Sequence, residues 1–257
     1  MTGASPPAGA PLLLVAAVAL ETTRLRRAIP FSAPAEQQPF SIASAEAFGR
    51  PLTLLHTGVG KANAAAAVAA VLAATPAALV LNFGVAGAYP GRGLDVGDLA
   101  LAEAEIYGDE GALAPEGFLD LEAMGLPILR RDGQRLFNRL PVDELRLESV
   151  RPVAENVAAA AGRRCLSGPF VTVSTCSGTT AAATALARRT GGLCENMEGA
   201  AIAQVCALHR LSFIELRGIS NLAEDRDLSR WDLTKAAEIA QRAVIALLTA
   251  WRPSKEE

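Results

Sequence analysis

The sequence predicts an α/β protein with a single domain, in which helices flank a mixed, largely parallel central sheet. Three observations carry this prediction. Short apolar runs alternate with longer alanine-rich segments along the 257 residues, the order that strand–helix–strand units produce. Hydrophobic residues make up 51% of the chain, enough to cover both faces of a buried sheet. No linker-like stretch divides residues 11–257, so we expect one domain there.

The first twenty residues divide into a tail and an apolar run. Residues 1–10 are rich in Gly, Ala and Pro, and we expect a disordered tail. Residues 11–20 are apolar, but no basic residues precede them and no clear cleavage site follows, as a signal peptide would require. They are also too few to span a bilayer. A buried first strand and a cytoplasmic protein are therefore predicted.

The remaining elements follow in chain order from composition. Short runs rich in Leu, Val and Ile predict strands at 12–18, 52–57, 77–83, 98–106, 169–174 and 212–218. Alanine-rich segments predict helices at 62–74, 142–161, 179–190, 198–209 and 233–250. Residues 108–133 are rich in Gly, Pro and charge, which predicts a long excursion that serves as a lid or a dimer contact.

Charge and cysteine content exclude several classes of function. The formal net charge of −3 gives no electrostatic reason to bind nucleic acid or a membrane surface. The four cysteines, at 165, 176, 194 and 206, match no zinc spacing, and we expect reduced thiols. We expect the protein to need neither a metal ion nor an organic cofactor.

Four polar or glycine-rich segments follow predicted strands: 58–63, 84–88, 174–179 and 217–221. Because ligands bind beyond the carboxyl ends of strands in such sheets, we expect these segments to converge on one pocket.

Glu198 and Asn221 are the residues that indicate a ligand. A carboxylate such as Glu198 can accept hydrogen bonds from two vicinal sugar hydroxyls, and its charge would stabilise an oxocarbenium-like sugar. The amide of Asn221 can donate to one atom and accept from its neighbour, as a 6-oxopurine edge requires. Together they indicate a purine nucleoside. The alternatives are a helix-start acid for Glu198 and a turn residue for Asn221.

Three further charged residues are candidates with open alternatives. Arg217 ends an apolar strand, so we expect it to pair with the active-site acid or the nucleophilic water, or else to form a structural ion pair. Glu21 follows the first strand and could be the general base or a first-turn helix acid. Glu195 is interpreted as a surface acid at a strand end. Asp109, in the excursion, is interpreted as a residue of a surface loop.

Several motifs resemble the nucleoside phosphorylase/nucleosidase superfamily, which includes methylthioadenosine/S-adenosylhomocysteine nucleosidases. They are Gly-Val-Gly-Lys-Ala-Asn at 58–63, Asn-Phe-Gly-Val-Ala-Gly-Ala at 82–88 with Val-Gly-Asp at 96–98, Met-Glu-Gly-Ala-Ala at 197–201, and Arg-Gly-Ile-Ser-Asn at 217–221. The stretch at 105–111 with Gly-Phe at 117–118 is most similar to the futalosine hydrolases within it. The resemblance covers roughly residues 12–250 and implies a nucleoside phosphorylase-like fold.

The resemblance also assigns roles to residues. It implies that Met197 packs on the sugar and that Thr175 and Cys176 contact the purine. It places Gly84, Val85 and Ala86 near the sugar or the water, and Phe118 at the 5′ end of the substrate. Adenine nucleosidases of the family carry Asp where Asn221 stands, which again favours a 6-oxopurine. Their essential Glu lies two residues after Glu21, where this chain has Thr23.

Water, rather than phosphate, is the expected nucleophile. The chain has no Gly-Asp-Pro-x-x-Arg near the first strand, and Val85 and Ala86 offer no hydroxyl, whereas a phosphate dianion needs several donors and positive charges. We therefore expect hydrolysis of futalosine to hypoxanthine, which the resemblance associates with menaquinone biosynthesis, by a homodimer or higher homo-oligomer. The alternatives are a purine nucleoside phosphorylase, a methylthioadenosine-type nucleosidase and a non-catalytic nucleoside-binding protein.

Overall fold

A mixed sheet flanked by helices forms the molecule, as predicted. The computed structural model describes residues 9–33, 35–37, 40–131 and 133–251; most of the predicted disordered tail, residues 1–8, lies outside them. Within the described residues the main sheet has ten strands in the order β11-β6-β12-β13-β5-β1-β4-β3-β2, with β14 paired to β5 and β6. Their bounds are β1 Leu12–Ala16, β2 Ala35–Gln37, β3 Phe40–Ala47, β4 Arg50–His56, β5 Leu79–Ala88, β6 Leu99–Tyr107, β11 Arg139–Pro141, β12 Cys165–Thr172, β13 Cys194–Asn196 and β14 Phe213–Leu222.

The sheet contains two parallel groups that run in opposite directions. Strands β4, β1, β5 and β14 are parallel neighbours, and so are β6, β12 and β13. The groups meet through antiparallel pairs between β13 and β5 and between β14 and β6. Strands β5, β14, β6, β12 and β13 therefore close into a ring, and we call these five strands the ring.

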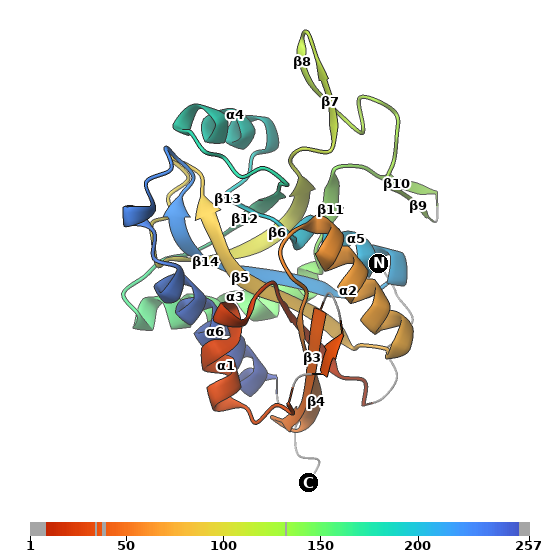
Figure 1. Ribbon diagram of the computed structural model, residues 1–257, viewed down its shortest axis with the longest axis vertical. Helices are drawn as coiled ribbons and strands as arrows, with labels where there is room; N and C mark the ends of the chain where they lie inside the picture. Colours follow the sequence, from red (N-terminus) through yellow and green to blue (C-terminus); the bar gives the residue numbers. More distant parts are fainter. Residues whose placement is uncertain (1–8, 34, 38–39, 132, 252–257) are drawn as a thin grey trace.

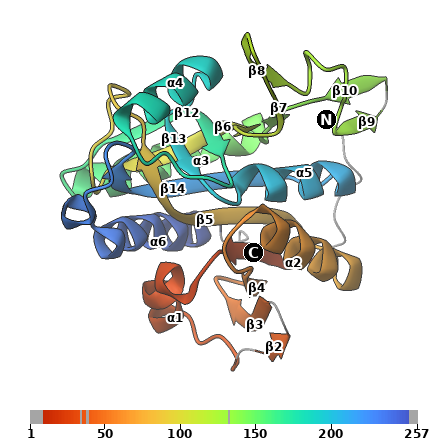
Figure 2. The ribbon, with the colours of Figure 1, turned by 45° about the horizontal axis from the view of Figure 1, so that its top comes forward.

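Helices cover the sheet on both sides (Figures 1 and 2). On one side α6 packs on β14 and β5, with α1 and α3 beside it; on the other side α2 packs on α5, which covers β12 and β6. The bounds are α1 Thr23–Ala28, α2 Lys61–Ala74, α3 Glu144–Ala160, α4 Thr180–Thr190, α5 Gly199–His209 and α6 Leu233–Ala250. Short 3-10 turns lie at Ala19–Thr22 (η1) and Leu228–Arg230 (η2).

Local sequence explains where several helices begin. The side chains of Asp143, Thr179 and Asp232 each accept a hydrogen bond from a backbone N–H in the first turn of α3, α4 and α6, which satisfies donors that the helix leaves open. Helix α4 ends at Gly191, whose φ of 72° suits glycine. The predicted helices thus have nearly the observed bounds.

The glycine-rich segments differ from the prediction in one respect. Strands β5 and β14 extend beyond the predicted ranges, to Ala88 and Leu222, so the segments 84–88 and 217–221 are strand residues rather than loops after strands. They lie side by side because β14 pairs with β5 in parallel register, with Arg217 opposite Gly84. Pairing, rather than loop convergence, brings these two motifs together.

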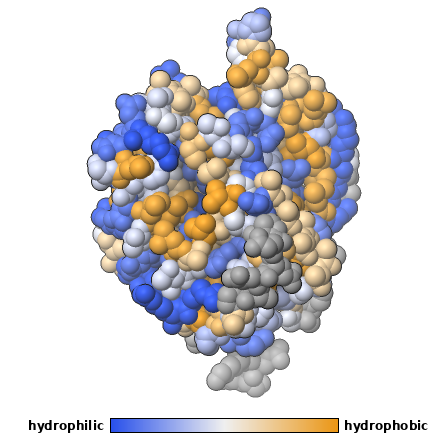
Figure 3. All heavy atoms as spheres, viewed as in Figure 1, coloured by the Kyte–Doolittle hydropathy of each residue, from blue (hydrophilic) through white to orange (hydrophobic). Residues whose placement is uncertain are grey.

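The predicted excursion at 108–133 contains one small hairpin and the first strand of a second hairpin that extends to residue 136. Strands β7 Gly111–Ala114 and β8 Gly117–Asp120 pair with each other, as do β9 Leu129–Arg131 and β10 Gln134–Leu136. The β7–β8 hairpin projects from the body, and the space-filling view shows polar and apolar residues together on the projection (Figures 1 and 3). Within the described part of the chain, no helix has the length and apolar character needed to cross a membrane.

Candidate active site

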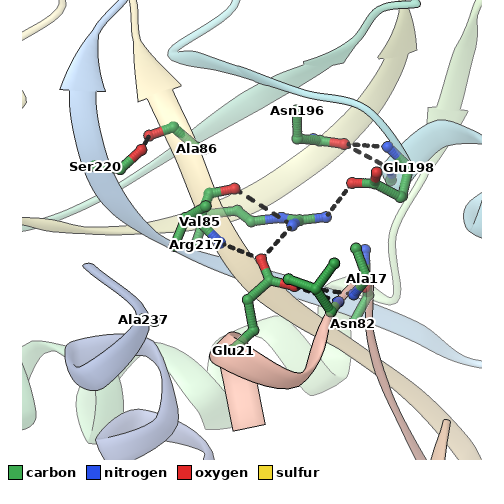
Figure 4. Close-up of polar contacts among 12 residues, drawn as sticks. Ala17, Glu21, Asn82, Val85, Ala86, Asn196, Glu198, Arg217, Ser220 and Ala237 are labelled. Carbon is green, nitrogen blue, oxygen red and sulfur yellow. Dashed lines mark hydrogen bonds and ion pairs between the residues drawn. The ribbon is translucent and has the colours of Figure 1, made fainter. Parts of the chain in front are cut away.

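Arg217 is the centre of a cluster of buried charges. It lies in β14 with 1% of its surface exposed. Its Nε donates to Glu215 Oε1 at 2.7 Å. Its Nη1 is 3.9 Å from Glu21 Oε1, and its Nη2 is 3.9 Å from Glu198 Oε2. Burial opposes the charged guanidinium, but the three carboxylates outweigh it and raise the pKa of Arg217. The guanidinium therefore stays charged between Glu21 and Glu198 (Figure 4).

Glu21 is held by backbone amides at the end of β1. It is 3% exposed. Oε2 accepts from the N–H groups of Ala17 and Val18, at 2.9 and 3.1 Å, and Oε1 accepts from Val85 N–H at 2.9 Å. The carboxylate completes the turn at η1 and also faces Arg217. Oε2 uses both of its lone pairs for these donors, whereas Oε1 keeps a further lone pair that a water could use.

Glu198 stands at the start of α5, but its side chain does not cap the helix. The first N–H groups of α5 are satisfied by Asn196 Oδ1 and Thr172 Oγ1 instead. Glu198 is 5% exposed, and its Oε1 accepts from Gly60 N–H at 2.8 Å. Burial raises the pKa of Glu198, although Arg217 and the Gly60 amide oppose the shift. Its carboxylate is therefore oriented by groups outside its own helix.

Gly84 makes room for this cluster. A Cβ at Gly84 would lie 2.1 Å from Glu21 Oε1 and 2.6 Å from Arg217 Nη1, closer than atoms can approach. The Val85 carbonyl is 3.4 Å from Arg217 Nη1, and the Ala86 carbonyl accepts from Ser220 Oγ at 3.2 Å. The three residues predicted from the resemblance thus contribute backbone to the cluster.

Asn221 lies four residues after Arg217 on β14, and the strand bulges between them. Ile219 pairs with Ala86 and Asn221 pairs with Gly87, so Ser220 is the extra residue, and such bulges redirect the side chain that follows. Asn221 is 9% exposed. Its Oδ1 accepts from Ser220 Oγ at 2.8 Å and its Nδ2 donates to the Leu222 carbonyl at 2.9 Å. Gly87 leaves space beside the amide, since a Cβ there would lie 3.0 Å from Nδ2.

The loop with Thr175 and Cys176 is anchored by Glu195, and the interpretation of Glu195 as a surface acid is wrong. Glu195 is 5% exposed, and its two oxygens accept from the backbone N–H and the hydroxyl of Ser177, each at 2.7 Å. Burial raises the pKa of Glu195, and the Ser177 donors oppose that shift. Thr175 is exposed, and Cys176 is half-buried against the small core beneath α4. One buried carboxylate therefore fixes this loop.

A second set of charged residues connects the segments at the edge of the site. Asp109 does not stand alone on the surface as expected: Oδ2 accepts from Ser174 N–H and Oδ1 pairs with Lys61, both at 2.6 Å. Phe118 lies in β8 opposite Leu113, with the Arg189 guanidinium of α4 3.8 Å from its ring centre, and it takes no part in the hydrogen bonds and ion pairs of the Arg217 cluster. Met197 is half-buried directly before Glu198.

Two buried acids of the cluster were missed by sequence reasoning. Glu215 is fully buried and accepts from Asn82 Nδ2 at 2.6 Å as well as from Arg217. Glu105 in β6 is fully buried near it. A signal existed for Glu215, since residues two apart on a strand share a face and Glu215 precedes Arg217 by two. Glu105 begins the stretch at 105–111 that resembles the futalosine hydrolases, but nothing in the local pattern indicates that it is buried while Glu103 is exposed.

Other features of the molecule do not coincide with this cluster. A groove of about 530 Å³ lies between α1 and α6 and includes Leu20, Arg24 and Gln241, but none of the predicted site residues lines it. We place the candidate site at the Arg217 cluster because the oriented polar groups converge there. Among the described residues, no group of three or more His, Cys, Asp and Glu side chains is arranged to hold a metal ion.

Comparisons with known proteins agree with this picture. The pattern of the family described as the phosphorylase superfamily matches residues 11–250. A futalosine hydrolase of Thermus thermophilus is 39% identical over 83% of this chain and 88% of that protein. One of Streptomyces coelicolor is 32% identical over 94% of this chain and 98% of that protein. A solved 5′-methylthioadenosine/S-adenosylhomocysteine nucleosidase of Neisseria meningitidis has a TM-score of 0.77 at 24% identity, covering 93% of this chain and 98% of that chain, which confirms the predicted fold.

Proposed function

The chain belongs to the phosphorylase superfamily, and from that premise we propose that it is an N-glycosyl hydrolase that cleaves futalosine and releases hypoxanthine. The observation that carries the proposal is the placement of the buried Arg217 between Glu198 and Glu21. Asn221 lies further along the strand that carries Arg217. The futalosine hydrolases that the chain resembles at 32–39% identity support the choice of substrate.

Glu198 binds the sugar in this proposal. Its carboxylate is already oriented by Gly60 N–H and faces Arg217, and it accepts hydrogen bonds from the 2′- and 3′-hydroxyls. The same negative charge stabilises the positive charge that develops on the ribose as the base departs. Met197 packs on the sugar beside it.

Glu21 activates the water. The water gives a proton to a free lone pair of the Glu21 carboxylate while its oxygen bonds to the anomeric carbon, and the electrons of the broken glycosidic bond go to the purine. Three backbone donors hold the carboxylate in one orientation, as a positioned base requires. Arg217 keeps the two acids apart and balances part of their charge.

Asn221 reads the purine. Its amide NH₂ donates to the 6-oxo group, and its carbonyl accepts from N7–H once the leaving base has taken a proton from solvent water; Glu21 returns the proton it took to solvent. In the unliganded arrangement these groups bond to Leu222 and Ser220, so the amide exchanges local partners for the base. Thr175 and Cys176 form a wall at the purine, on the loop that Glu195 anchors. Phe118 is assigned to the 5′ end.

Hydrolysis is favoured over phosphorolysis by the charge of the cluster. Arg217 is shared among Glu21, Glu198 and Glu215, so its positive charge is not available to a phosphate dianion. Val85 and Ala86 bring no hydroxyl to the same place. A dianion entering here would meet carboxylates rather than the donors it needs, whereas a neutral water meets no such repulsion.

The biological setting is part of the proposal. We assign the chain to menaquinone biosynthesis, to the cytoplasm and to a homodimer or higher homo-oligomer that acts on a purine nucleoside and water without metal or cofactor. Gel filtration with light scattering measures the oligomeric state, and a monomer would contradict it.

A single set of reactions tests the function. The purified protein is incubated with futalosine, inosine and methylthioadenosine, each with and without phosphate, and the released base is separated by chromatography. We expect hypoxanthine from futalosine at a rate that phosphate does not change, and release about 150-fold slower from the Glu198→Gln control at the same enzyme concentration. Phosphate-dependent release would indicate a phosphorylase, and preferred release of adenine would indicate a methylthioadenosine-type enzyme. Binding without turnover would indicate a nucleoside-binding protein.

A further inference from the structure

Two fully buried acids meet inside the ring, behind the candidate site. Glu105 lies in β6 and Glu215 in β14, strands that pair with each other. A Cβ built on Gly199, the first residue of α5, would lie 2.5 Å from Glu105 Oε2 and 2.5 Å from Glu215 Oε2. The two carboxyl groups are therefore neighbours, and they have this space only because residue 199 is glycine.

Hydrogen bonding distinguishes the two acids. Glu215 uses one oxygen for Arg217 Nε at 2.7 Å and the other for Asn82 Nδ2 at 2.6 Å. Neither oxygen of Glu105 accepts a well-formed hydrogen bond among the described residues when both acids are ionised. The nearby Thr172 hydroxyl, which donates to Asn196 Oδ1 at 3.3 Å, only partly opposes the rise in the pKa of Glu105. A buried anion without donors is costly, and two carboxylates cannot bond to each other unless one carries a proton. A proton on Glu105 removes both difficulties, because the acid then donates to Glu215.

The charges around Glu105 favour the same arrangement. Burial raises the pKa of Glu105 well above its usual range, the charge of Glu215 raises it further, and Arg217 opposes the shift. Among the described residues, the other titratable groups near the pair are Cys194 of β13, whose thiol pKa is raised by burial and by both acids, Glu198, and Tyr107 of β6, whose pKa is raised by burial and by the charges of Glu110 and Glu105. Arg217 already faces three carboxylates, so a fourth negative charge beside it would have no cation to balance it.

We propose that Glu105 is a positioning residue that retains a proton and donates it in a hydrogen bond to Glu215, which thereby holds the guanidinium of Arg217 between Glu198 and Glu21. Glu105 touches neither substrate nor water and acts only through Glu215 and Arg217. Its kinetic consequence rests on the proposed function, but the presence of the proton does not.

Two variants of Glu105 separate the proton from the shape of the side chain. Glu105→Gln keeps a neutral donor of similar size, whereas Glu105→Leu keeps the bulk and removes the donor. Glu103→Gln is the matched control, since Glu103 lies in the same strand but is exposed and pairs with Arg151. Circular dichroism melting shows which variants fold.

The proton itself is measured by infrared spectroscopy of the protein without substrate. We expect the wild type at neutral pH to have a protonated-carboxyl C=O band that is lost in Glu105→Gln and kept in Glu103→Gln. In turnover of futalosine we expect Glu105→Gln to keep kcat within about threefold of the wild type. Glu105→Leu should lower kcat roughly 10- to 100-fold with a smaller change in KM, the size expected when a hydrogen bond to a charged group is lost.

Two results would overturn the inference. One is a carboxyl band that is absent or unchanged in Glu105→Gln, which would mean that Glu105 is ionised. The other is a Glu105→Gln enzyme as impaired as Glu105→Leu, which would mean that the donor is not what matters. If Glu105→Leu does not fold, the band and the rate of Glu105→Gln still decide. If the wild type fails to cleave futalosine while the band behaves as expected, the proposed function fails and the shared proton stands.

Discussion

The sugar side of the candidate site and its outer rim are built on different principles. On the sugar side, Glu21, Glu198 and Arg217 are between 1% and 5% exposed and are held by strand pairing and backbone amides. The outer rim, by which we mean the 174–179 loop and the β7–β8 hairpin, is largely exposed: Leu113 in the hairpin is 88% exposed. Under the proposed function, the chemistry belongs to a preorganised interior, while the contacts of the 174–179 loop with the base and of the hairpin with the 5′ group belong to segments that can vary without disturbing it.

Substitution of Glu21 should give the largest effect and tests most directly whether the buried side of the site carries the chemistry. We expect Glu21→Gln to lower kcat by about 10²–10⁴-fold because an amide cannot take a proton from water. The amide also has one acceptor oxygen for three backbone donors, so the free energy of unfolding should fall by about 1–3 kcal/mol. Single-turnover kinetics well below the melting temperature measure the first effect. The control is Glu238→Gln, an exposed acid paired with Arg24. An unchanged kcat in Glu21→Gln would assign the base elsewhere.

Glu198 gives the next largest effect. Glu198→Gln should lose roughly 3 kcal/mol of transition-state stabilisation, or about 150-fold in kcat/KM. Because the pKa of Glu198 is raised by burial and the ionised form is the active one, wild-type activity should fall with decreasing pH at a higher pH than an ordinary glutamate would cause. A kcat/KM profile over acidic pH measures this, and an unchanged kcat/KM in Glu198→Gln would place the sugar contact elsewhere.

Asn221 lies between the two regions, and its substitution should change the selectivity between 6-oxo and 6-amino substrates more than it changes the rate. Asn221→Asp replaces the donor that faces O6 by a carboxylate, which repels O6 and can accept from a 6-amino group. A buried polar mismatch costs about 1–3 kcal/mol, so the preference for futalosine over its 6-amino analogue should fall at least about tenfold. The measurement is kcat/KM for both substrates with both proteins. If the ratio is unchanged in a folded variant, Asn221 does not read the 6-position.

The rim should give the smallest effect. Phe118→Ala removes the ring that Arg189 covers, a contact worth about 0.5–1 kcal/mol at an exposed site. We expect KM to rise by up to about fivefold and kcat to stay unchanged. Leu119→Ala, at the next position of the same strand, is the control. A large loss of kcat in Phe118→Ala would show that the rim takes part in the chemistry and would remove the distinction between the two regions.

The same distinction explains how much the sequence predicts. The long strands and helices follow from periodicity and alanine content, and residues at the ends of apolar runs, such as Arg217 and Asn221, stand out as polar groups in apolar surroundings. The three-residue strand β13 and the hairpins are too short to have a periodic signal. The burial of Glu105 and Glu195 depends on partners more than 15 residues away in sequence, and no local pattern contains that information. The roles of the site residues stay predictions until they are measured.

The closed ring also determines when the site can form during synthesis. Its closure requires β14, residues 213–222, to pair with β5, residues 79–88, and with β6, contacts separated by well over one hundred positions. A nascent chain that has not yet exposed β14 holds Glu21 and Gly84 but neither Arg217 nor Asn221. The ribosome-bound intermediate therefore leaves β5 and β6 with unpaired edges, which makes it the species most dependent on chaperones.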